Sequence, residues 1–210
     1  MSAACRAPQR LNRTRSRSRR RASLATAGAA AALVLSACSS GGTSGGSGNT
    51  NFITGKDGIA TVKKGERAAA PDLSGTTIDG KKLDAVQYKG KVVVINVWGS
   101  WCPPCRAEAT NFVKVAKETA DKGVQFIGIN TRDTSTEPAR AFEKQYGVMY
   151  PSLYDPTGKL MLRFKKGTLN PQAIPSTLVL DRDGKIAART LQPLSEEKLH
   201  EILDPVLAEK

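Results

Sequence analysis

An apolar segment that leads directly into two closely spaced cysteines constrains the fold of this chain more than any other feature. Residues 92–98 read Val-Val-Val-Ile-Asn-Val-Trp, and Trp-Cys-Pro-Pro-Cys follows at residues 101–105. The first segment is too apolar to alternate between core and solvent, so we predict a strand buried on both faces of a parallel sheet. Proline is tolerated in the first turn of a helix, so Pro103 and Pro104 predict a helix that begins at Cys102.

The two thiols of this motif have the placement of a reactive dithiol. Unpaired N–H groups and the helix dipole favour a thiolate at a helix N-terminus, where cysteine pKa values fall from about 8.5 into the range of about 3.5–7.5. We therefore expect Cys102 to be the nucleophile and Cys105, one turn on and more buried, to be the resolving thiol. Trp101, with Pro103 and Pro104, is expected to offer a docking face for the substrate.

The remaining pattern predicts one α/β domain over residues 58–210. The expected elements are a β-hairpin (74–78 and 81–83), a helix (107–120), a strand (124–129), a helix (137–146), two antiparallel strands (176–180 and 185–190) and a final helix (195–209). This order predicts a mixed sheet flanked by helices, with the hairpin as an N-terminal extension. Reactive groups in such sheets lie beyond the carboxyl ends of the parallel strands, which is where Cys102 falls.

The N-terminal part has the composition of a targeting segment. Eight of the 32 basic residues are arginines between Arg6 and Arg21, and no acidic residue precedes Asp57. A short apolar stretch, 22–37, follows the arginines, so we interpret them as part of a secretory leader and not as a nucleic-acid-binding arm. The stretch ends in Leu-Ser-Ala-Cys at residues 35–38, which resembles the lipobox of bacterial lipoproteins.

The lipobox resemblance implies a lipoprotein signal peptide over residues 1–37 and a diacylglycerol group on Cys38. Residues 38–57 then form the lipidated cysteine and a flexible Gly/Ser tether. This organisation predicts a lipid-anchored protein on the extracytoplasmic face of a bacterial cell membrane. An ordinary signal peptide with a chance cysteine at its end is the alternative.

The number of cysteines limits the chemistry of the domain. Of the four cysteines, Cys5 is lost with the leader and Cys38 is lipidated, so only two thiols remain. A structural zinc site needs four ligands, and these two thiols and the distant His200 do not supply them. Haem attachment requires a histidine where Arg106 stands. We therefore expect no metal and no cofactor, only a redox-active disulfide between Cys102 and Cys105.

The segment Val-Ile-Asn-Val-Trp-Gly-Ser-Trp-Cys-Pro-Pro-Cys-Arg-Ala-Glu resembles the active-site segment of thioredoxin-fold proteins, specifically the membrane-tethered TlpA/ResA-like branch. The similarity extends over roughly residues 68–205. It implies a thioredoxin-like fold and a thiol-disulfide oxidoreductase. It further implies that client protein disulfides, including those of apocytochrome c, are the substrates and that a membrane thiol transporter is the electron donor.

The resemblance also concerns residues outside the CPPC motif. Ile174-Pro175 resembles the residue and cis-proline that face the active-site disulfide, with Ile174 available for pairing with a substrate peptide. Glu108 stands where the branch has an active-site acid, although a solvated helix glutamate explains it equally well. Asn96 replaces the buried aspartate of cytoplasmic thioredoxins, which argues against release assisted by that aspartate.

Two other functions are kept as alternatives. A peroxiredoxin has a related fold, but it needs a threonine three residues before its reactive cysteine, and Gly99 stands there. A non-catalytic binding module on the same scaffold is the second alternative. The intact pair of cysteines beside a candidate cis-proline argues against it.

Overall fold

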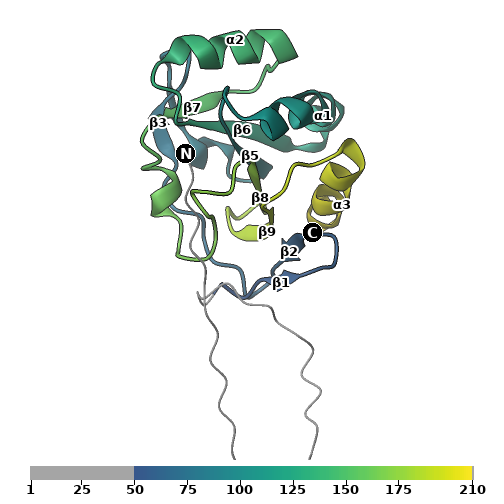
Figure 1. The fold of residues 1–210 in the computed structure, drawn as a ribbon. Coiled ribbons are helices and arrows are strands. Elements are labelled where there is room, and N and C mark those ends of the chain that lie inside the picture. Colours follow the sequence, from purple (N-terminus) through teal and green to yellow (C-terminus); the bar gives the residue numbers. More distant parts are fainter. Residues whose placement is uncertain (1–49, 210) are drawn as a thin grey trace, which may run out of the picture. The chain divides into compact units, whose positions relative to one another are not determined.

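A computed structural model describes residues 50–209, which form a seven-stranded mixed sheet with helices packed against it (Figure 1). The expected signal peptide, the lipidation site Cys38 and residues 39–49 of the expected tether lie outside the described residues. Within the described part, none of the helices is long and apolar enough to cross a bilayer.

The elements follow one another in the order expected of an α/β chain. The strands are β1 (Ile53–Thr54), β2 (Ile59–Thr61), β3 (Ser74–Thr76), β4 (Lys82–Asp84), β5 (Val92–Trp98), β6 (Val124–Thr131), β7 (Ser152–Asp155), β8 (Ser176–Leu180) and β9 (Ile186–Thr190). The helices are α1 (Pro103–Thr119), α2 (Thr136–Tyr146) and α3 (Glu196–Leu207), with short 3-10 turns η1 (Ala85–Tyr88), η2 (Ala120–Lys122) and η3 (Met161–Arg163). The strand order of the main sheet is β1-β2-β9-β8-β5-β6-β7, and β3 and β4 form a separate two-stranded sheet.

Strand β5 is central and is buried at every position, as predicted. It runs parallel to β6 and antiparallel to β8. Its side chains alternate between the two faces of the sheet. Val94 packs in a cluster with residues of α1 and α3, whereas Val93 and Ile95 pack with residues of the β3–β4 hairpin and of η3. Because Asn96 and Trp98 share the face of Val94, the strand directs both toward the helix that carries the cysteines.

Local chemistry sets the ends of the helices. The Cys102 sulfur caps α1 by accepting the backbone N–H of Cys105, and the Ser195 hydroxyl caps α3. Gly147 ends α2 in the left-handed region, with φ of 70°. Helix α1 starts at its two prolines, as their tolerance in the first turn predicts.

The fold class predicted from the sequence is confirmed, but three strands were not predicted. Strand β7 is only four residues long and pairs in parallel with the edge of β6. Strands β1 and β2 are shorter still and extend the sheet through β9. Because β1 begins at Ile53, the sheet includes residues that the sequence analysis assigns to the tether. Short segments such as these have too few residues to show a period.

Candidate active site

The two cysteines of the CPPC motif form a disulfide at the N-terminus of α1, with sulfurs 2.09 Å apart. Both residues are only 1% exposed, and they pack in one cluster with Trp98 and Phe142. The expectation that Cys105 is more buried than Cys102 is therefore wrong for this oxidised form. One reason is that the carbonyl oxygen of Ile174 lies 3.7 Å from the Cys102 sulfur.

The first turn of α1 brings one backbone donor to the Cys102 sulfur. Pro103 and Pro104 have no N–H, so the first available amide belongs to Cys105. Its nitrogen lies 3.3 Å from the Cys102 sulfur and donates toward it. A hydrogen bond to the charged form of a group favours that form. The Cys105 amide therefore lies where a donor favours negative charge on the Cys102 sulfur.

The Ile174–Pro175 segment faces the disulfide. Its peptide bond is cis, as the resemblance to thioredoxin-fold proteins implies. Ile174 is half-buried, and it packs against the cluster that contains both cysteines. The structure therefore brings Ile174 and Pro175 to the CPPC motif from 72 residues away in the chain.

Glu108 is buried, with 2% exposure, which rules out the alternative of a solvated helix glutamate. Its Oε1 accepts a 2.9 Å hydrogen bond from the Asn96 side-chain amide, and its Oε2 accepts a 2.9 Å bond from the backbone N–H of Leu194. Burial raises the pKa of the Glu108 carboxyl to about 7 from its ordinary 4.5, and the two hydrogen bonds oppose that rise. A group with such a pKa can take or give a proton near neutral pH.

The turn before Cys102 is held by the loop between β6 and α2. Asp133, which is 4% exposed, accepts the backbone N–H of Ser100 at 2.9 Å and the Ser100 hydroxyl at 2.5 Å. The Asn130 side-chain amide donates to the same carboxylate at 2.6 Å. The sequence does not predict this contact, because Ser100 and Asp133 are 33 residues apart and neither belongs to a motif.

The two tryptophans near the motif have different environments. Trp98 is 2% exposed and stacks on Phe142 with ring centroids 4.3 Å apart, so it is a core residue. Trp101 is 42% exposed, and its indole N–H donates to the backbone carbonyl of Thr131 at 3.2 Å. Trp101 is therefore the tryptophan of the pair that a docking partner can touch.

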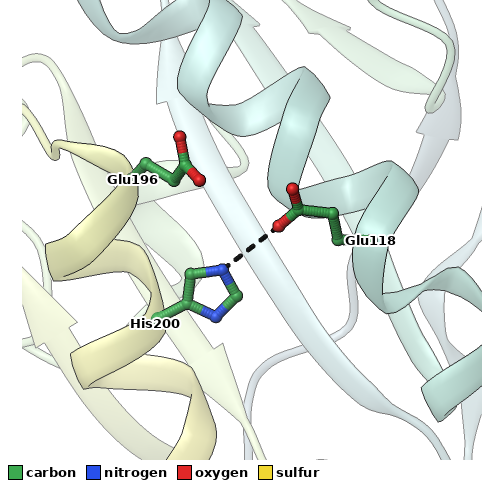
Figure 2. A group of neighbouring side chains, drawn as sticks. All are labelled: Glu118, Glu196 and His200. Carbon is green, nitrogen blue, oxygen red and sulfur yellow. Dashed lines mark hydrogen bonds and ion pairs between the residues drawn. The ribbon is translucent and has the colours of Figure 1, made fainter.

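One group of metal-ligand type lies away from the cysteines, on α1 and α3. Ligand atoms of Glu118, Glu196 and His200 lie within 4.8 Å of one another (Figure 2). The His200 Nε2 atom is 3.3 Å from Glu118 Oε2. The Lys114 ammonium is 2.6 Å from Glu196 Oε1, so a cation already balances these carboxylates. We interpret the group as an ion-pair network that joins the two helices.

Comparison with known proteins identifies relatives with this chemistry. The family model described as Redoxin matches residues 63–205. Thiol-disulfide oxidoreductase ResA of Bacillus cereus is 29% identical over 137 residues, which span 65% of this chain and 76% of ResA. Thiol:disulfide interchange protein HelX of Rhodobacter capsulatus is 31% identical over 151 residues, which span 71% of this chain and 80% of HelX. The structure of a secreted thiol-disulfide isomerase from Corynebacterium glutamicum matches with a TM-score of 0.68 and 29% identity, over 75% of this chain and 97% of that one.

These relatives agree with the geometry of the site. A disulfide spaced as Cys-x-x-Cys caps a helix at the carboxyl end of a central parallel strand, and a cis-proline segment faces it. The matched family region contains the whole arrangement. The chain therefore belongs to the Redoxin family and is a thioredoxin-fold thiol-disulfide oxidoreductase, similar to the TlpA/ResA-like proteins.

Proposed function

We propose that this oxidoreductase reduces disulfides of client proteins outside the cytoplasm, with Cys102 as the attacking thiol. The observation that supports attack by Cys102, and not by Cys105, is the 3.3 Å contact from the Cys105 amide to the Cys102 sulfur. It gives Cys102 a hydrogen-bond donor at the N-terminus of a helix, where a negative charge is favoured. The thiolate is the nucleophile in disulfide exchange, so the donor selects the cysteine that reacts first.

The reaction then has two exchanges that leave the protein in the form seen here. The Cys102 thiolate attacks one sulfur of the client disulfide, and the other client sulfur leaves as a thiolate that takes up a proton. Cys105 loses its proton and attacks the Cys102 sulfur, which releases the second client thiolate. Two electrons have passed to the client, and the protein holds the Cys102–Cys105 disulfide.

Glu108 and the Ile174–Pro175 segment have supporting roles in this proposal. Glu108 lies one helical turn after Cys105, and its pKa of about 7 suits it to accept the Cys105 proton. The backbone carbonyl of Ile174 is 3.7 Å from the Cys102 sulfur. A client segment that pairs with the backbone there is brought to the reactive sulfur, and the cis bond to the buried Pro175 fixes the direction of the Ile174 backbone.

The N-terminal sequence supports a location for the protein outside the cytoplasm. The lipobox-like segment ending at Cys38 supports a lipid anchor, and the similar thiol-disulfide isomerase from Corynebacterium glutamicum is described as secreted. We infer a domain tethered to the outer face of the cytoplasmic membrane, which receives electrons from a membrane thiol transporter. In this proposal the client disulfides include those formed by the haem-binding cysteines of apocytochrome c.

Reduction of insulin disulfides by the purified domain tests the reaction. With dithiothreitol as reductant, the wild-type protein is expected to accelerate precipitation of the insulin B chain, and Cys102→Ser is expected to abolish that acceleration. Cys105→Ser keeps the attacking thiol but loses the resolving one, so it is expected to stall as a mixed disulfide. Full activity in Cys102→Ser contradicts the proposal.

Cell fractionation tests the location separately. The full chain is expected in the membrane fraction, and Cys38→Ala is expected to appear in the periplasm or the medium. Cys5→Ala is the matched control, because it removes a cysteine that lies within the leader. Retention of Cys38→Ala on membranes refutes the lipid anchor without affecting the assignment of the dithiol.

A further inference from the structure

Beside the buried disulfide lies an exposed aromatic ring that is fixed in place. Trp101, the residue before Cys102, is 42% exposed. Its indole N–H is nevertheless bonded to the Thr131 carbonyl at 3.2 Å. A large apolar surface that is held rigid costs little conformational entropy when a partner binds to it.

The Arg132 side chain lies next to this ring, and the Arg132 backbone has a conformation that arginine rarely adopts. The guanidinium carbon lies 5.3 Å from the centre of the Trp101 ring, within the range of a cation–π interaction. The φ angle of Arg132 is 60°, in the left-handed region; Asn51 is the other non-glycine residue between 50 and 209 with positive φ. Asparagine tolerates this region, but arginine gains nothing from it, and such backbone conformations concentrate at functional sites.

The Arg132 side chain also connects the two segments that border the disulfide. One of its terminal nitrogens donates to the backbone carbonyl of Pro171, which lies just before the Ile174–Pro175 segment. The same side chain thus lies over the ring next to Cys102 and contacts the segment opposite it.

The neighbouring acid does not expose its carboxylate at this surface. Asp133 is 4% exposed, and its carboxylate accepts hydrogen bonds from Ser100 and Asn130. The exposed charged side chains in segments 99–107, 131–134 and 170–175 are those of Arg106 and Arg132, both positive. The border of the disulfide is therefore a cationic surface.

We propose that Trp101 and Arg132 form a docking platform for an acidic side chain that flanks the client disulfide. This inference rests on the proposed reduction of client proteins, and it adds a preference among them. The ring receives the apolar part of the client segment, and the guanidinium pairs with a carboxylate near the client cysteines. Opposite charges of this kind mainly raise the rate of association.

Three synthetic peptides test the platform. They share one Cys-x-x-Cys disulfide and differ only in the flanking residues, which are glutamate, glutamine or lysine. The pre-reduced protein is mixed with each peptide, and single-turnover oxidation is followed by the fluorescence of its two tryptophans. We expect the glutamate peptide to react about three-fold faster than the lysine peptide or more, and we expect 0.5 M salt to remove most of the difference.

Variants of the protein test whether Arg132 causes the preference for the glutamate peptide. Arg132→Gln is expected to equalise the three rates, and Arg132→Lys to restore part of the difference. Lys117→Gln is the matched control, because it removes the same charge from the exposed face of α1 about 18 Å along the helix from Cys105. It should leave the preference unchanged.

The outcomes separate this inference from the proposed function. Equal reduction of all three peptides by the wild type overturns the platform and leaves the reductase standing, and so does a preference that survives in Arg132→Gln. If no peptide is reduced, both fail. Because the comparison of peptides uses the wild-type protein, the inference stays testable even if a variant does not fold.

Discussion

The side-chain amide of Asn96 on β5 donates a 2.9 Å hydrogen bond to the carboxyl group of Glu108 on α1. Both residues are buried, at 5% and 2% exposure, so the bond joins the central strand to the cysteine-bearing helix inside the protein. The amide favours the ionised carboxylate, whereas burial favours the neutral acid, and burial has the larger effect on the Glu108 pKa.

Glu108→Gln is expected to change how stability depends on pH. The pKa of Glu108 is raised to about 7 when folded, against 4.5 in the unfolded chain, so the folded state binds the proton more tightly. Stability from this group is complete below pH 4.5 and is lost as pH rises through 7, by about 3 kcal/mol at most. Urea unfolding of the oxidised protein at pH 4.5, 6 and 8 measures it. Glu201→Gln, an exposed change on α3, is the control, and a wild-type minus Glu108→Gln difference that does not vary with pH contradicts the prediction.

Asn96→Ala is expected to raise the Glu108 pKa further. The substitution removes a donor to the carboxylate, and a hydrogen bond to a charged group contributes about 1.5–3 kcal/mol, which corresponds to about one pKa unit or more. Titration of the Glu108 carboxyl carbon by NMR measures the shift. Thr177→Val removes only the longer 3.4 Å contact of Asn96 and should leave the midpoint near that of the wild type. The same midpoint in Asn96→Ala as in the wild type would show that the amide does not control this acid.

Pro104→Ala is expected to lower the pKa of the Cys102 thiol. The side chain that caps a helix accepts N–H groups from the second or third helical residue, and Pro104 is the second. Alanine restores that N–H and adds a donor beside the one from Cys105, so the thiolate form of Cys102 is favoured. The rate of alkylation of Cys102 as a function of pH, in the Cys105→Ser background, measures it. Pro103→Ala restores an N–H at the first position and serves as the control, and equal pKa values in all three proteins contradict the argument.

The CPPC site could be predicted because its determinants are local in sequence. The apolar run fixed the strand, the prolines fixed the start of the helix, and the resemblance supplied the Ile174–Pro175 segment. The partners of Glu108 and the contact between Ser100 and Asp133 could not be predicted, because they join residues 12 to 86 positions apart through tertiary packing. The unusual backbone of Arg132 has no sequence signal, since arginine does not prefer that conformation.

Asp133→Ala is expected to destabilise the protein by about 1–3 kcal/mol, because it leaves the Ser100 N–H and the Asn130 amide without an acceptor. Ser100→Ala removes the hydroxyl contact alone and is expected to cost about 0.5–1.5 kcal/mol. Urea unfolding of the oxidised forms compares the two. A loss in Ser100→Ala equal to or larger than that in Asp133→Ala would show that the Ser100 N–H and the Asn130 amide do not depend on the buried carboxylate.

Mass spectrometry of trapped intermediates tests the central claim, attack by Cys102, most directly. Reduced Cys105→Ser and Cys102→Ser proteins are each mixed with the same oxidised peptide and quenched with acid after a series of short times. The account predicts rapid formation of a peptide adduct on Cys102 in Cys105→Ser and little or no adduct in Cys102→Ser. Faster adduct formation on Cys105 in Cys102→Ser would contradict it.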